Sequence, residues 1–145
     1  MSTKRVTGIG GIFFKAKKPT ELARWYRDRL GVELEAGSDA DESGSGTDEE
    51  SSGVSAIFRW REEPPSERPG MTVWAVFPDS TKHFSPGSAP FMINYRVEDL
   101  DAVLEALRAE DVWVDDHRED SEYGRFAWIQ DPEGDRIELW QPPDA

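Results

Sequence analysis

Cysteine is absent from this 145-residue chain, and histidine occurs only twice. Without cysteine the protein has no disulfide bond, no thiol nucleophile and no thiolate metal ligand. Of the two histidines, His83 lies between the two halves described below and His117 lies in a polar stretch, so neither falls on a strand expected to carry metal ligands. The composition therefore excludes cysteine-based sites and disfavours histidine-based ones.

Long apolar runs are also missing, and lysine is scarce. No segment resembles a signal peptide or a membrane-spanning helix, which predicts a cytoplasmic protein with no membrane partner. The chain has five lysines, twelve arginines and 30 acidic residues, which gives a net charge of −13. This balance argues against nucleic-acid binding, which needs a basic face. An acidic, lysine-poor surface favours a halophilic protein, although an ordinary acidic protein is the alternative.

The sequence does contain an internal duplication. Residues Gly8–Leu30 and Ala89–Asp111 both read as an apolar strand, an amphipathic helix and a turn, and the ends of the two halves match as well. Each half predicts the order β-α-β-β-β. We therefore expect an α+β fold in a single domain, residues 1–145, with one module at about 6–78 and another at about 89–142. Its eight strands should form a mostly antiparallel sheet curled around a shared cavity.

An acidic segment, residues 35–53, interrupts the first module. It is rich in Gly, Ser, Asp and Glu and contains no Lys or Arg. Such a sequence cannot build a core, so we interpret it as a solvated insertion. Its aspartates do not fit the twelve-residue ligand spacing of a calcium loop.

The chain resembles the vicinal oxygen chelate superfamily, which includes glyoxalase I, extradiol dioxygenases and bleomycin-resistance proteins. The resemblance covers nearly the whole chain and is strongest in LARWYRDRLGV at 22–32, RVEDLDAVLEAL at 96–107 and DPEGDRIELWQP at 131–142. It implies paired β-α-β-β-β modules and, in metal-dependent members, ligands on the first and last strand of each module. It also implies a homodimer.

Carrying this ligand pattern over to the chain assigns the four positions to Gly11, Trp74, Met92 and Glu138. Among these side chains, only Glu138 binds a hard divalent ion well. One carboxylate does not make a metal site, since a catalytic metal normally has about three protein ligands. We therefore predict no metal cofactor.

Strand alternation predicts what lines the cavity instead. Aromatic and apolar side chains should alternate with a few polar groups, as in sites for small organic molecules. We expect Glu138 at this site with the ligand-binding residues Phe13, Lys15, Trp74, Met92, Asn94, Arg96 and Trp140. Alternatively, Glu138 is a structural carboxylate paired with Arg96 or Lys15, and the tryptophans are core.

These residues lead to a first hypothesis of a glyoxalase-like protein that binds an aromatic or amphipathic small molecule in an apolar cavity without a metal. The alternative is a glyoxalase-type lyase or isomerase, or a dioxygenase. In that case Glu138 is either the catalytic base, removing a proton alpha to a carbonyl, or a ligand of a divalent metal. A third interpretation is a structural protein whose cavity is filled.

Overall fold

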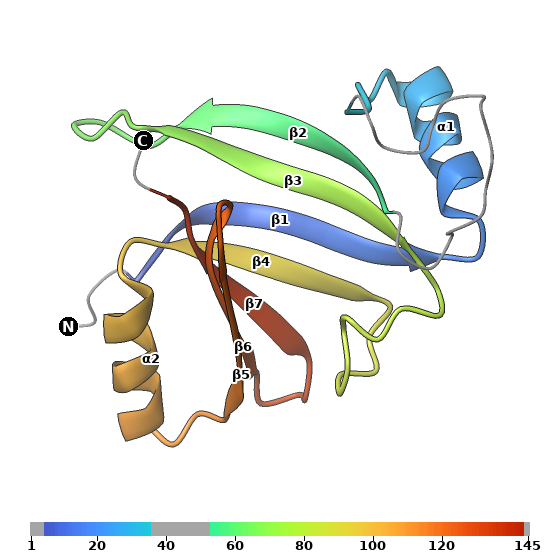
Figure 1. Ribbon diagram of the computed structural model, residues 1–145. Coiled ribbons are helices and arrows are strands. Elements are labelled where there is room, and N and C mark those ends of the chain that lie inside the picture. The colour runs from blue at the N-terminus through green and yellow to red at the C-terminus, as the bar shows by residue number, and fades with distance from the viewer. Residues whose placement is uncertain (1–4, 36–52, 144–145) are drawn as a thin grey trace.

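Figure 1 shows the computed structural model of the protein, which describes residues 5–35 and 53–143. Most of the predicted acidic insertion lies outside the described residues. Across these described residues the fold is α+β, with seven strands in one mixed sheet and two helices. The strands are β1 (Val6–Ala16), β2 (Val54–Arg61), β3 (Pro69–Pro78), β4 (Phe91–Val97), β5 (Val114–Ser121), β6 (Gly124–Gln130) and β7 (Arg136–Gln141). The helices are α1 (Pro19–Leu30) and α2 (Leu100–Ala109).

The sheet has the strand order β2-β3-β1-β4-β7-β6-β5. In both halves the first strand pairs in parallel with the last one, β1 with β3 and β4 with β7, while the remaining pairs are antiparallel. The antiparallel contact between β1 and β4 joins the two halves at the centre of the sheet (Figure 1). The predicted duplication is therefore visible in the strand pairing.

Two details of the predicted sheet are wrong. The described residues form seven strands instead of the expected eight: the segment Val32–Glu35, where the first module would place its second strand, makes only one isolated bridge, between Leu34 and Ala56. The sheet also remains open, with β2 and β5 as its edges, instead of curling strongly around a cavity.

Local sequence explains where α1 begins and ends and where α2 begins. Pro19 occupies the first turn of α1, where its missing N–H costs nothing, and Gly31 ends this helix in a left-handed conformation with φ of 72°. The carboxylate of Asp99 caps α2 by accepting a hydrogen bond from the Ala102 N–H at 3.1 Å. Neither of these two helices is long and apolar enough to cross a membrane.

The helices cover one face of the sheet, and a separate cluster fills the other. On the helix side, Ala23 of α1 packs with Val54 and Val76, while α2 packs on the second half through Leu100 and Leu104. The opposite face carries an aromatic cluster of Phe13, Ala75, Phe84, Met92 and Trp128. Phe84 belongs to the segment 79–90 between β3 and β4, so this link closes over the sheet face that carries the predicted site.

Candidate functional site

A buried carboxylate lies at the centre of that second face. Glu138 of β7 is directly opposite Asn94 of β4, and its side chain is only 4% exposed. One carboxylate oxygen, Oε1, accepts a hydrogen bond from Asn94 Nδ2 at 2.6 Å, and the other, Oε2, accepts one from Trp128 Nε1 at 2.9 Å. A carboxylate removed from water is costly unless its oxygens are bonded, and here both oxygens are bonded.

His83 supplies a further contact to the same carboxylate. Its Nε2 atom lies 3.1 Å from Glu138 Oε2, and the imidazole ring stacks on Phe77 with 5.4 Å between ring centroids. The His83 side chain is 34% exposed, so it stands between the buried carboxylate and solvent. Hydrogen-bond donors from β4, β6 and the link thus converge on one acidic group.

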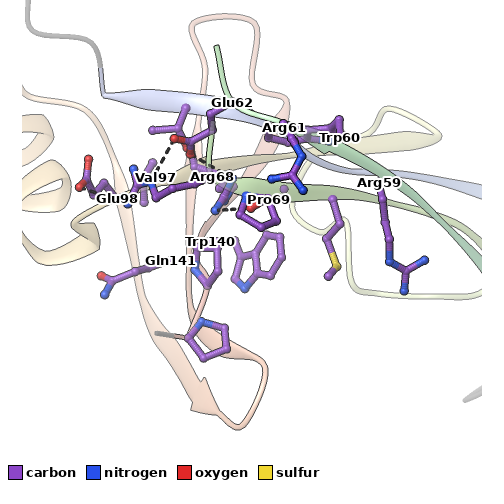
Figure 2. A pocket seen from close by; sticks show the side chains of 16 residues that line it. Arg59, Trp60, Arg61, Glu62, Arg68, Pro69, Val97, Glu98, Trp140 and Gln141 are labelled. Atoms are coloured by element: carbon purple, nitrogen blue, oxygen red, sulfur yellow. Dashed lines mark hydrogen bonds and ion pairs between the residues drawn. The ribbon is translucent and has the colours of Figure 1, made fainter. Parts of the chain in front are cut away.

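A cavity of about 960 Å³ opens further along the sheet. Figure 2 shows Pro69 and Trp140 near its centre, with Arg59 toward one end and Glu98 and Gln141 toward the other. Strand pairing gathers these side chains, because Arg61 is opposite Pro69 and Arg96 is opposite Trp140. Four arginines line this cavity although the chain as a whole is strongly acidic. They are Arg59, Arg61, Arg68 and Arg96.

Glu62 organises two of these arginines. Its carboxylate lies 3.1 Å from Arg68 Nε and 3.1 Å from Arg96 Nη1, and it accepts a hydrogen bond from the Ser66 hydroxyl at 2.7 Å. The Ser66 hydrogen bond, with the hydrogen bond of Arg68 and the charges of Arg68 and Arg96, holds the pKa of Glu62 below its ordinary value, although burial opposes this. The Arg96 guanidinium also lies 5.5 Å from the centroid of the Trp60 ring.

The sequence and the fold agree on a family. A family model described as the glyoxalase/bleomycin resistance protein/dioxygenase superfamily matches residues 9–139. The chain belongs to this superfamily. No curated protein matches it significantly in sequence.

Solved structures share the fold of this superfamily member at low sequence identity. A methylmalonyl-CoA epimerase from Streptomyces coelicolor, in complex with 2-nitronate-propionyl-CoA, is 16% identical, with a TM-score of 0.63 over 96% of this chain and 99% of that one. The methylmalonyl-CoA epimerase from Mycobacterium tuberculosis is 22% identical, with a TM-score of 0.59 over 99% and 93% of the two chains. A Legionella pneumophila structure described as an NAD-dependent benzaldehyde dehydrogenase is 10% identical, with a TM-score of 0.56 over 92% and 98%.

Most of the residues predicted for the site do lie on the second face. Phe13 and Met92 are in its aromatic cluster, and Asn94 contacts Glu138 directly. Lys15 places its Nζ 5.4 Å from the centroid of the Phe84 ring. Arg96 and Trp140 line the cavity, whose lining does not include Glu138. The predicted set is therefore divided between the Glu138 cluster and the arginine-lined cavity.

Trp74 was expected beside these residues, and that placement is wrong. Its ring packs against Phe14 and Tyr26 on the helix side of the sheet, with centroid distances of 5.4 and 5.2 Å. The parallel register of β1 and β3 sets Trp74 opposite Ile12 and Ala75 opposite Phe13. Phe13 corresponds to Asn94 in the duplication, and Asn94 is opposite Glu138, so the first-half position equivalent to Glu138 is Ala75. A difference of one residue along a strand places the side chain on the opposite face of the sheet.

The residues present do not fit the metal site that the superfamily implies. Ala75 has no coordinating atom, and a Cβ atom added to Gly11 would lie 2.6 Å from the Phe13 ring. Met92 is buried in the aromatic cluster, and the oxygens of Glu138 already face three nitrogen atoms. Within residues 5–35 and 53–143, no three histidine or acidic side chains are grouped so as to hold a metal ion.

His83 is the contact that sequence reasoning missed. It was set aside because it lies outside the predicted strands, yet the link folds back and carries its ring to Glu138. Nothing in the sequence around His83 indicates this long-range contact. Only its rarity, as one of two histidines, distinguishes it.

Proposed function

We propose that this superfamily member binds a small organic anion in the arginine-lined cavity without using a metal ion. The observation that carries this proposal is the lining itself, in which four arginines surround Met71, Pro69 and two tryptophan side chains. Apolar surface supplies affinity, and guanidinium groups bind and orient carboxylate or phosphate groups. The cavity is more basic than the apolar one expected from the sequence.

The charge distribution supports an anionic ligand over a neutral one. The chain carries −13 overall, whereas the cavity lining has four arginines against two acidic residues, Glu62 and Glu98, so the cavity is a local positive region on a molecule that otherwise repels anions. Glu62 holds two of the guanidiniums in place before any ligand arrives. Such preorganisation lowers the entropy cost of binding.

The enzyme alternative places the chemistry at Glu138, and the contacts of this residue do not favour it. A general base needs a carboxylate oxygen within hydrogen-bond reach of the substrate. Both oxygens of Glu138 are engaged by nitrogen atoms, and the side chain is nearly inaccessible. Glu138 is therefore better suited to holding the link against the sheet than to removing a proton.

Thermal unfolding and tryptophan fluorescence, measured on chelator-treated protein with a panel of organic anions, test the proposal. The panel includes methylmalonyl-CoA, which is bound in one of the similar structures. A true ligand present at about 100 times its Kd should stabilise the folded state by roughly 2.7 kcal/mol. Proton exchange of methylmalonyl-CoA in heavy water, lost in Glu138→Gln, would instead establish the enzyme alternative.

A matched pair of variants locates the binding site. Met71→Glu places a negative charge inside the cavity and should weaken anion binding about tenfold or more. Arg108→Glu changes the net charge of the protein by more than Met71→Glu does. Because Arg108 lies in α2, outside the cavity lining, this variant should bind anions nearly as well as the wild type. Equal binding by both variants, or no stabilisation of the wild type by any anion, would contradict the proposal.

A further inference from the structure

The four arginines of the cavity are not equivalent. Arg68 and Arg96 share the carboxylate of Glu62, and Arg68 also lies 3.6 Å from Glu98. Among the described residues, Arg59 and Arg61 form no ion pair, and the hydrogen bond of Arg61 goes to the main-chain carbonyl of Glu67 at 3.1 Å. The guanidiniums with charge available for a ligand are therefore those of Arg59 and Arg61.

Arg59 lies toward one end of the cavity, and Arg61 lies between it and the centre, beside Pro69 (Figure 2). Both belong to the edge strand β2, where Arg59 is opposite Met71 and Arg61 is opposite Pro69. Trp140 belongs to β7, which is separated from β2 by β3, β1 and β4. Four strand spacings of about 4.8 Å give a span of roughly 19 Å between the two strands. The site is thus long compared with a single aromatic ring.

The opposite end of the cavity is unfavourable for a second negative charge. Glu98 and Gln141 lie there, away from Arg59 (Figure 2), and Arg96 is already neutralised by Glu62. Nearer the centre of the cavity, Trp140 presents a fixed apolar wall, because its ring stacks on Phe126 and its Nε1 donates to the Tyr123 carbonyl at 2.7 Å. Charge and apolar surface are therefore separated along the cavity.

We infer that the ligand is an elongated amphipathic molecule with a single anionic group, which binds at Arg59 and Arg61, and an apolar tail that extends toward Trp140. This inference rests on the proposed function, since it assigns the chemical class and orientation of a ligand in the same cavity. A carboxylate and a phosphate present the same bidentate acceptor chemistry to a guanidinium, so either can be the anionic group.

Calorimetric titration with matched probes tests the class of ligand. The probes are ω-phenyloctanoate, its primary amide, ω-phenyloctyl phosphate, benzoate and octanedioate. The long acid should bind about tenfold or more tightly than its amide, and more tightly than benzoate or the doubly charged octanedioate. Comparison of the acid with the phosphate identifies the preferred anionic group, and a preference for either supports the inference.

Variants test the orientation. The double substitution Arg59→Gln and Arg61→Gln should weaken binding of the long acid about tenfold or more and leave the amide unchanged, whereas Arg108→Gln should affect neither. If the acid and amide bind equally, if octanedioate binds best, or if the double variant retains full affinity, the inference is wrong while the proposed function stands. If no probe or panel anion binds the wild type, the proposed function itself fails.

Discussion

The imidazole of His83 and the carboxylate of Glu138, 55 positions apart in the chain, meet with 3.1 Å between Nε2 and Oε2. This contact fastens the link between the two halves onto the last strand of the sheet. Asn94 and Trp128 hold the same carboxylate from neighbouring strands. The acidic residue that metal-dependent relatives would use as a ligand here joins four segments of one chain.

Replacing Glu138 should therefore destabilise the fold. Glu138→Ala leaves buried N–H groups of Asn94 and Trp128 without an acceptor, and the loss of such a partner is expected to cost about 3–5 kcal/mol. Urea unfolding at neutral pH measures this change. Glu105→Ala, an exposed substitution in α2, is the control and should stay within about 0.5 kcal/mol of the wild type. Equal midpoints for the two variants would show that the cluster is not structural.

The variant His83→Phe tests the hydrogen bond between His83 and Glu138 separately from the stacking of the His83 ring on Phe77. Phenylalanine preserves an aromatic ring against Phe77 but removes the nitrogen that faces Glu138. We expect a loss of about 1–2 kcal/mol in the free energy of unfolding, smaller than for Glu138→Ala because two donors to the carboxylate remain. Hydrogen exchange of the link amides should also accelerate in this variant. Unchanged exchange would mean that the histidine does not fasten the link.

The strand and helix boundaries followed from local patterns. The apolar strands and amphipathic helices of the two halves predicted the order of elements, and Asp99 and Gly31 mark helix ends because capping depends on adjacent residues. The order of the strands and the superfamily also agree with the duplication and its motifs. The single-domain boundaries, the homodimer and the cytoplasmic location stay predictions.

The site was less accessible to sequence reasoning because it depends on register. The sequence similarity of the two halves equates Trp74 with Glu138, whereas the strand pairing equates Ala75 with Glu138. A shift of one residue moves a side chain through the sheet, so a small alignment error changed the predicted lining. The contacts of His83 and Glu62 connect distant segments, and no local pattern encodes them.

The ion pairs of Glu62 predict a pH dependence of stability. The pKa of Glu62 is lowered in the folded protein from its ordinary value of about 4.5, chiefly by the Ser66 hydrogen bond and then by Arg68 and Arg96. Between the folded and unfolded values, the unfolded chain binds more protons, so the stabilisation is present above about pH 4.5 and is lost as the pH falls through the folded value. Urea midpoints measured from pH 7 downward should fall less steeply for Glu62→Gln than for the wild type in this acidic range. If the urea midpoints of the wild type and Glu62→Gln fall in parallel with pH, Glu62 does not contribute to the pH dependence of stability.

The net charge of −13 predicts that salt stabilises the protein. Unpaired acidic side chains repel one another, and the screening length shrinks from about 10 Å at 0.1 M salt to about 3 Å at 1 M. Raising KCl from about 0.1 M to 2 M should therefore raise the Tm, by roughly 4 °C for each kcal/mol gained. The double variant Asp116→Lys and Glu122→Lys, which reduces the negative charge at two exposed positions, should respond less. If wild type and variant gain equally, salt acts through general effects on hydration, and a Tm that does not rise at all would contradict the halophilic interpretation.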